Sequence, residues 1–433
     1  MSILSQIIFG LLLLGAVGLF LKNAKNIWFN ILLGKPFERN DQKKERWKRV
    51  IFLALGQKKM FKRPIPAFLH FFVYVGFLII NLELLEIVLD GLTGKHRILA
   101  PLLGGIYVPL INIFEFFAVA VLISCVIFWI RRNIIKIKRF HLKEMLSWPK
   151  LDANLILFFE ITLMFILLSM NTTDTIIQNA NGHAQSFLFS DLLIPLYSGL
   201  GDNIHIAERF FWWAHITGIF FFANYVLYSK HLHIFLAFPN SYYSNLEAAG
   251  GMDNMDSVTN EVKLMLGMPA DNAAPAEIGR FGAKDVTDLS QKSLLDAYAC
   301  TECGRCTSNC PANLTGRSLS PRKIMMDTRD RLQEVGENKR KHGADYDDGK
   351  SLLGDYITEE EIFACTTCNA CTEACPVSIE PVSIINELRR YKIMEEAKGP
   401  NEWNMMFQNI ETSFAPWKFP PTDRGNWIND LNK

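Results

Sequence analysis

Two runs of cysteines carry the most distinctive chemistry in this sequence of 433 residues. Each run has the pattern C-x2-C-x2-C-x3-C-P, at residues 300–311 and again at 365–376. This spacing lets one tight loop aim three thiolates at a [4Fe–4S] cluster, and in two-cluster proteins the fourth cysteine binds the other cluster. The proline that follows has no N–H to donate and ends the loop. The sequence thus predicts two clusters with these ligands: Cys300, Cys303, Cys306 and Cys375 for one, and Cys365, Cys368, Cys371 and Cys310 for the other.

Two other uses of cysteine explain the pattern less well. Structural zinc sites use paired C-x2-C units, but they need neither a third cysteine at the same spacing nor a Cys-Pro, twice over. Disulfides are disfavoured because the cysteine-rich half is expected on the reducing, cytoplasmic side of a membrane. The one cysteine outside the runs, Cys125, lies in an apolar stretch and is expected to pack in a core.

The first 235 residues hold the elements that would place these clusters at a membrane. Apolar residues make up 49% of the chain and include 32 Phe, concentrated in this half. Each of five apolar runs is long enough to cross about 30 Å of hydrocarbon. The runs are residues 3–21, 65–88, 107–130, 153–170 and 210–228. The sequence therefore predicts an all-α protein, with a five-helix transmembrane bundle at 1–238 followed by a cytoplasmic α-helical cluster domain.

Lys and Arg side chains indicate the orientation of this bundle. They crowd the connections at 35–63 and 131–150, whereas the other connections are nearly free of them. Because basic loops stay inside, the N-terminus is predicted outside and the cysteine runs in the cytoplasm, at a bacterial inner membrane. We expect membrane lipid and quinone as partners, and no nucleic acid.

Histidines at the ends of the apolar runs suggest a second kind of cofactor. His70 lies near the cytoplasmic end of the second run, and His215 and His233 bracket the fifth. On one straight helix these last two would be five turns apart, on one face and separated by about 27 Å. A histidine in a membrane is costly without a partner or a ligand. We therefore predict that His70 and His233 bind one b-type haem, against the plainer alternative of hydrogen-bonded structural residues.

A second, outer haem at His215 would need another ligand. His205 is the first choice, with His183 and His96 as alternatives, so the sequence predicts one or two haems. His231 is expected to be an interfacial polar residue instead. Four acids in the spans are candidates either for a proton relay to quinone or for the outer interface. They are Glu83, Glu86, Glu115 and Glu160.

The second half divides into a linker at 239–284, a cluster domain at 285–398 and a tail at 399–433. Helix signals separate the cysteine runs, which favours an α-helical cluster domain. They are Ser320 and Pro321 at the start of a helix to about 334, and a capping box of Thr358 and Glu361. Further helices are predicted at 260–266 in the linker and at 380–398 after the second run. Residues 339–350 are expected to form a solvated loop.

The first half resembles the gamma subunit of respiratory nitrate reductases. The resemblance rests on five helices, an outside N-terminus and the phrase Ser229-Lys-His-Leu-His233-Ile-Phe. In that family, helices two and five each give two histidines to two b haems. His70, His215 and His233 fit three of these places, whereas the fourth falls near Ile80, which cannot bind iron.

The second half is similar to the C subunit of heterodisulfide reductases and to the iron–sulfur subunit of anaerobic glycerol-3-phosphate dehydrogenase, over about 285–398. Its tail, from Asn409 to Trp417 with Trp427, resembles the segment that leads into CCG domains in longer relatives. The resemblance implies a soluble partner, a CCG iron–sulfur or flavoprotein subunit, docked on aromatic anchors of the tail such as Trp403.

These features together predict a membrane-anchored electron-transfer subunit. It would relay electrons among a soluble catalytic partner, two [4Fe–4S] clusters, b-type haem and quinone. No nucleophile–base pair or nucleotide loop is apparent, so substrate chemistry is expected on the partner. A redox sensor or assembly scaffold without quinone turnover is the alternative; an ion transporter would be expected to show inverted repeats or broken helices.

Overall fold

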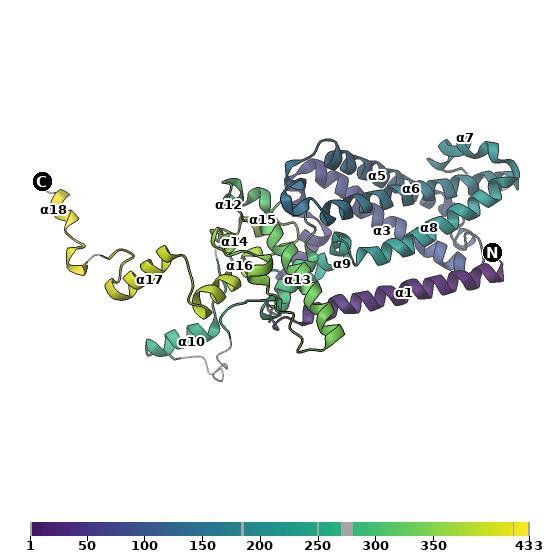
Figure 1. Ribbon diagram of the computed structural model, residues 1–433. Helices are drawn as coiled ribbons and strands as arrows, with labels where there is room; N and C mark the ends of the chain where they lie inside the picture. The colour runs from purple at the N-terminus through teal and green to yellow at the C-terminus, as the bar shows by residue number, and fades with distance from the viewer. Residues whose placement is uncertain (1, 183–185, 249–250, 270–279, 419, 432–433) are drawn as a thin grey trace.

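The computed structural model describes residues 2–182, 186–248, 251–269, 280–418 and 420–431, and this part of the chain is helical. It contains no β-strand, only two isolated bridges, Lys35 with Ser290 and Leu353 with Ile357. The predicted all-α class is therefore confirmed. Five long helices form an elongated bundle (Figure 1). They are α1 (Ile3–Leu32), α3 (Pro64–Thr93), α5 (Tyr107–Asn133), α6 (Trp148–Ala180) and α8 (Ile204–Val226).

The bundle has the composition of a membrane domain. Among the described residues, four helices are long and apolar enough to cross a membrane, and a fifth span exists if a bent pair of helical segments counts as one. Helix α1 leaves most of its large apolar side chains uncovered, for example Ile3 and Leu14. Apolar side chains in such numbers require lipid around them. The protein is thus membrane-associated, while the five spans and the outside N-terminus stay predictions.

The fifth predicted span is sharply bent. Helix α8 ends at Val226, a 3₁₀ turn follows at Lys230–Leu232, and α9 (His233–Tyr242) begins at an angle of 87° to the preceding segment. The expectation that His215 and His233 share one face of a straight helix is therefore wrong. The Ser229 hydroxyl accepts from the His231 N–H at 3.0 Å, and Asp152 accepts from the Lys230 N–H at 3.2 Å. Side chains that bind the backbone in this way compete with helix continuation.

Short helices around the cysteine runs form the second part of the molecule. The main ones are α11 (Gln291–Ala299), α13 (Pro321–His342) and α16 (Pro381–Arg390). The predicted caps are confirmed: the Ser320 side chain accepts from the Lys323 N–H, and Thr358 with Glu361 forms a capping box. Helix α13 continues to His342, so the loop expected from 339 begins only at Gly343.

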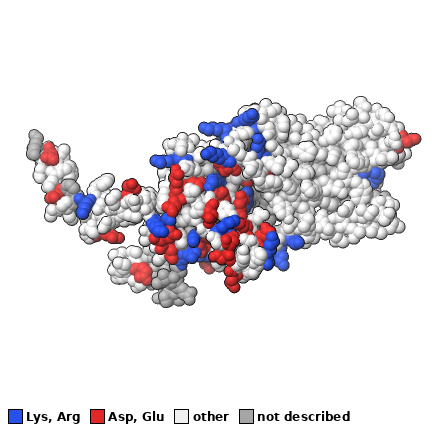
Figure 2. Space-filling model, in the orientation of Figure 1, with Lys and Arg blue, Asp and Glu red and all other residues white. Residues whose placement is uncertain are grey.

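One end of the bundle contributes to the hydrophobic core of the cluster domain. Ile31 of α1, with Leu227 and Leu232 at the bend, packs in the same buried cluster as residues of α11, α13 and α16. Charge follows the same division, because Lys, Arg, Asp and Glu gather over the cluster domain and leave the bundle almost bare (Figure 2). This common core fixes the cysteine loops against the inner end of the bundle.

Two helical segments project from this body. Helix α10 (Asp256–Met265) lies in the predicted linker, and α17 (Asn401–Ser413) with α18 (Trp427–Leu431) forms an extended tail (Figure 1). The tail exposes large apolar side chains, among them Phe414 at 81% and Trp417 at 76%.

Candidate redox site

The two cysteine loops have the same backbone twist. In each run the residue two after the first cysteine and the residue four after it are left-handed. These are Glu302 (φ 54°) and Gly304 (φ 68°) in the first loop, and Thr367 (φ 55°) and Asn369 (φ 55°) in the second. Left-handed backbone is uncommon outside glycine, so its repetition at matching positions indicates two loops built for the same purpose.

The side chains of the two cysteine runs lie close together. Cys300 and Cys306 both lie within electrostatic range of Cys303 and Cys375, and Cys306 also lies within range of Cys371. Cys365 and Cys371 both lie within electrostatic range of Cys310. No group of three His, Cys, Asp or Glu side chains in the described residues is arranged to hold a single metal ion. The crossed assignment of ligands to the two cluster cages stays a prediction.

The thiols fit an iron cluster in their electrostatics. Burial raises the pKa of Cys300 and of Cys371 to about 12 and that of Cys375 to about 11, and neighbouring thiolates add to the shift. Thiolates in this setting need a positive partner, which cluster iron supplies. The backbone assists, since the Thr367 N–H donates to the Cys365 Sγ at 3.3 Å.

The two loops differ in their surroundings. The first loop is buried against the bundle, where Glu302 is 3% and Arg305 5% exposed. In the second loop Cys368 is exposed. The Phe363 ring, two residues before Cys365, contacts the Trp403 ring of the tail at 5.1 Å. The first loop thus faces the membrane half, and the second lies toward solvent and the tail.

His70 and His233 come together at the inner end of the bundle. Their ring centres are 6.4 Å apart, with planes at 42°. A metal bound to two imidazole nitrogens by bonds of about 2 Å separates the ring centres by roughly 6 Å. The Nδ1 of His70 lies 3.0 Å from the Gln57 Oε1, and that of His233 lies 3.0 Å from the Lys230 carbonyl oxygen. With Nδ1–H donating to these acceptors, each Nε2 is left to bind a metal, which is the usual arrangement of ligating histidines.

The other histidines are placed differently. His205 is exposed and lies on α8 ten residues before His215. That spacing corresponds to about 15 Å along the axis, so the structure does not bring His205 to His215 and the predicted pairing is wrong. His96 instead binds the Asp174 carboxylate at 3.0 Å, and His183 lies outside the described residues. His215 is buried, and its Nδ1 has no hydrogen-bond partner in the described part of the chain.

His231 is closer to the inner pair than the sequence indicated. Its ring lies 5.6 Å from that of His233 and 5.8 Å from that of Phe222. The expectation of an interfacial polar residue did not foresee this contact, which arises because the chain bends at this point.

Two of the four intramembrane acids serve structure at the far end of the bundle. Glu86 accepts from the Tyr107 hydroxyl at 2.8 Å, and Glu115 accepts from the Ser190 N–H at 3.1 Å. Glu83 is buried, and its Oε2 has no partner among the described residues. Only Glu83 of these three thus keeps an oxygen unoccupied.

Polar side chains of the first cysteine loop contact the segments that hold the two histidines. Glu302 pairs with Lys230, the residue whose carbonyl binds His233. Arg305 donates to the carbonyls of Lys59 at 3.2 Å and Met60 at 3.4 Å, just after Gln57. Sequence reasoning missed these contacts. The sequence did hold a signal for them: Glu302 and Arg305 are charged, whereas the equivalent residues of the second run, Thr367 and Ala370, are neutral.

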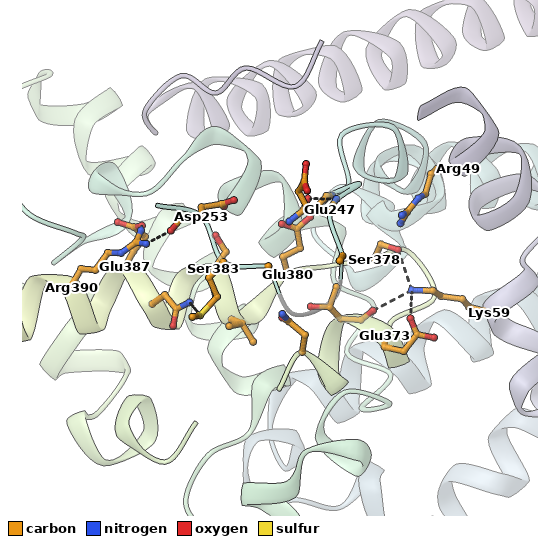
Figure 3. A pocket seen from close by; sticks show the side chains of 18 residues that line it. Arg49, Lys59, Glu247, Asp253, Glu373, Ser378, Glu380, Ser383, Glu387 and Arg390 are labelled. Carbon is orange, nitrogen blue, oxygen red and sulfur yellow. Dashed lines mark hydrogen bonds and ion pairs between the residues drawn. The ribbon is translucent and has the colours of Figure 1, made fainter. Parts of the chain in front are cut away.

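A cavity of about 230 Å³ lies beside the second loop, between the linker, α16 and the loop before α3. Lys59 projects into it and bonds the Thr372 carbonyl and the Ser378 hydroxyl, both at 3.3 Å, while Arg390 lies near Glu387 at its other end (Figure 3). Its charges are of both signs and several are paired, so the cavity indicates no particular ligand.

Comparison with known proteins supports the iron–sulfur chemistry. Residues 299–379 match the family model of the 4Fe-4S dicluster domain. The chain therefore carries a domain for two [4Fe–4S] clusters, as the cysteine spacing predicts.

Longer relatives extend the likeness to the membrane half. The chain is 30% identical to a Bacillus subtilis protein named probable iron-sulfur-binding oxidoreductase FadF, over 95% of this chain and 59% of that protein. It is 26% identical to the EtfAB:quinone oxidoreductase of Syntrophomonas wolfei, over 93% of this chain and 56% of that protein. The chain thus spans little more than half the length of these relatives.

The cluster domain has narrower relatives. The C subunit of a heterodisulfide reductase from Methanosarcina acetivorans is 32% identical, over 26% of this chain and 56% of that protein. No solved structure matches the chain. These likenesses support membrane-linked electron transfer by an iron–sulfur protein, and the resemblance to the nitrate reductase gamma subunit stays a prediction.

Proposed function

We propose that the protein relays electrons between a soluble partner and membrane quinone, through its two [4Fe–4S] clusters and a b-type haem held by His70 and His233. Clusters and haem supply one-electron chemistry, which the protein positions and tunes. The chain's own residues provide the cages, the imidazole pair and the contact that joins them.

The His70–His233 pair carries this proposal. Two half-buried imidazoles with ring centres 6.4 Å apart, each with its Nδ1 held by an acceptor, would be able to bind one iron between them. The alternative of structural histidines bonded to each other does not explain why both Nδ1 atoms are bonded elsewhere. The pair also lies beside the first cysteine loop, as a relay requires.

The choice of partners rests on the relatives. A similar protein is named EtfAB:quinone oxidoreductase, which supports quinone on the membrane side and an EtfAB-type or CCG-type protein on the soluble side. The exposed Cys368 and the aromatic tail next to it favour docking at the second loop. Deletion of residues 399–433 is expected to release the partner on purification, and retention of the partner would refute the docking role of the tail.

The proposed location is the bacterial inner membrane, with the cluster domain in the cytoplasm and the N-terminus outside. An outer haem at His215 would need a second ligand other than His205, which lies too far along α8.

The decisive experiment is an optical spectrum of the purified protein, reduced minus oxidised, with haem and iron counted per chain. We expect b-type absorption and about eight iron atoms in clusters. Replacement of His70 or His233 by Ala should remove the inner haem, because the remaining imidazole would hold it too weakly.

His231→Phe is the matched control, since this ring also lies close to His233 but is not proposed to bind iron. It should keep full haem content. Absence of b-type absorption from the wild-type protein, or full haem in both alanine variants, would overturn the haem assignment and leave a cluster protein only.

A further inference from the structure

We propose that the first cysteine loop, through Glu302 and Arg305, positions the His70–His233 pair and sets the reduction potential of the haem bound there. This inference rests on the proposed function, because it requires a haem at that pair. It adds a role for two charged residues that bind no cofactor themselves.

Glu302 forms an ion pair with the segment that carries His233. It lies between Cys300 and Cys303 and pairs with the buried Lys230. Lys230 in turn offers its carbonyl oxygen to His233 at 3.0 Å, and it also lies 3.7 Å from Asp152 of α6. Glu302, in the first cysteine loop, is thus linked through Lys230 to His233, a proposed haem ligand.

Arg305 acts on the other imidazole. Its guanidinium donates to the carbonyls of Lys59 and Met60, in the 3₁₀ turn η2 (Lys58–Lys62) that follows Gln57. The Gln57 side chain binds the His70 Nδ1 at 3.0 Å. The Arg305 charge is also near enough to act on the His70 ring. Both imidazoles are therefore held by segments that the same loop contacts.

Because the Glu302 and Arg305 charges are buried, their electrostatic effect on nearby groups is strong. Glu302 and Arg305 are 3% and 5% exposed, so water screens them weakly. A negative charge near the haem disfavours the added electron and lowers the potential, while a positive charge raises it. The matching positions of the second loop, Thr367 and Ala370, carry no charge. The charges are thus a property of the loop that faces the haem.

The test is an equilibrium redox titration of the haem, followed optically without turnover. Glu302→Gln should raise the haem potential and Arg305→Gln should lower it. Each change is expected to alter the equilibrium constant for haem reduction by roughly three- to tenfold, and the double variant should return close to wild type. Glu302→Asp, which keeps the charge, should restore most of the wild-type potential.

Glu373→Gln is the matched control. Glu373 is also an acid within a cysteine run and is paired with a lysine, Lys62 of η2, but both side chains are exposed, so water and ions screen the charge. It should leave the haem potential unchanged. If Glu302→Gln fails to assemble, Lys230→Gln tests the same contact and should lower the potential, since it removes a positive charge.

The outcomes separate this inference from the proposed function. A wild-type protein without haem overturns both. A protein with haem and full iron, whose potential stays constant or moves in the same direction in the Glu302 and Arg305 variants, overturns the inference and leaves the relay intact.

Discussion

The two cysteine loops share a spacing and a backbone twist, yet they occupy opposite environments. The first loop packs against the membrane bundle, and its buried charged side chains contact the segments next to His70 and His233. The second loop exposes Cys368 and borders the tail. The cysteines and left-handed residues therefore specify the cage, while the residues between them specify which side of the relay each cage serves.

This division of roles has a physical reason. Cluster ligation needs thiolates at fixed separations, which a repeated loop supplies whatever lies around it. Position and potential depend on burial, charge and hydrogen bonds around the cluster. A repeat can thus keep its ligands and change its neighbours, so that two similar cages differ in their exposure and in what they touch.

The largest expected effect tests whether the cages are crossed. Cys300→Ala and Cys375→Ala should remove one and the same cluster, and Cys365→Ala and Cys310→Ala should remove the other. Each variant is expected to fall from about eight to about four iron atoms per chain. Iron analysis gives the loss, and electron paramagnetic resonance of the reduced protein shows which cluster persists.

The control for this experiment is Cys125→Ala, since Cys125 is buried in the bundle core away from both runs. It should keep both clusters. If the Cys375→Ala and Cys365→Ala variants instead give the same paramagnetic resonance spectrum, both have lost the same cluster. Each run then holds its own cluster, and the crossed assignment is wrong.

A smaller effect is expected from alanine at two matching left-handed positions of the loops, Gly304 and Asn369. At Gly304 (φ 68°) a Cβ would lie 2.5 Å from the Nη1 of the fully buried Arg322. Gly304→Ala therefore combines an unfavourable backbone with displacement of Arg322, at a cost of about 2–3 kcal/mol. Asn369→Ala places no new atom in the loop and should cost less, about 1 kcal/mol for alanine in a left-handed backbone.

Loss of cluster absorbance during heating measures this difference. Asn369→Gly, which removes the same side chain but relieves the backbone, is the matched control and should be more stable than Asn369→Ala. Equal midpoints for Gly304→Ala and Asn369→Ala would show that the first loop is not more tightly enclosed than the second.

Much of the cluster domain could be predicted from the sequence, because its signals are local. Cysteine spacing, the Ser320 cap and the Thr358–Glu361 box each depend on residues a few positions apart. The bend before His233 could not be predicted, since it depends on Asp152 of a distant helix binding the Lys230 backbone. The packing of Ile31 in the cluster-domain core is likewise a contact between segments far apart in the chain.

The smallest effect of a single substitution is expected at Glu373, in a comparison of the lysine–glutamate contacts that join each loop to the bundle. Lys62 and Glu373 are 2.6 Å apart but 59% and 62% exposed, whereas Lys230 and Glu302 are 9% and 3% exposed. Glu373→Gln should cost no more than about 0.5 kcal/mol. Glu302→Gln should cost about 3–5 kcal/mol, because two largely buried cations, Lys230 and Arg329, both lose the carboxylate that they share.

The same heating assay, repeated at low and high salt, distinguishes the two contacts. The difference between Glu373→Gln and wild type should vanish at high salt, since ions screen an exposed pair, whereas the deficit of Glu302→Gln should persist. Lys59 would still bind the Thr372 carbonyl and the Ser378 hydroxyl after loss of Glu373, which keeps the second loop in place. A Glu373→Gln deficit as large as that of Glu302→Gln would mean that both loops are anchored by charge, and the contrast between them would then be one of exposure alone.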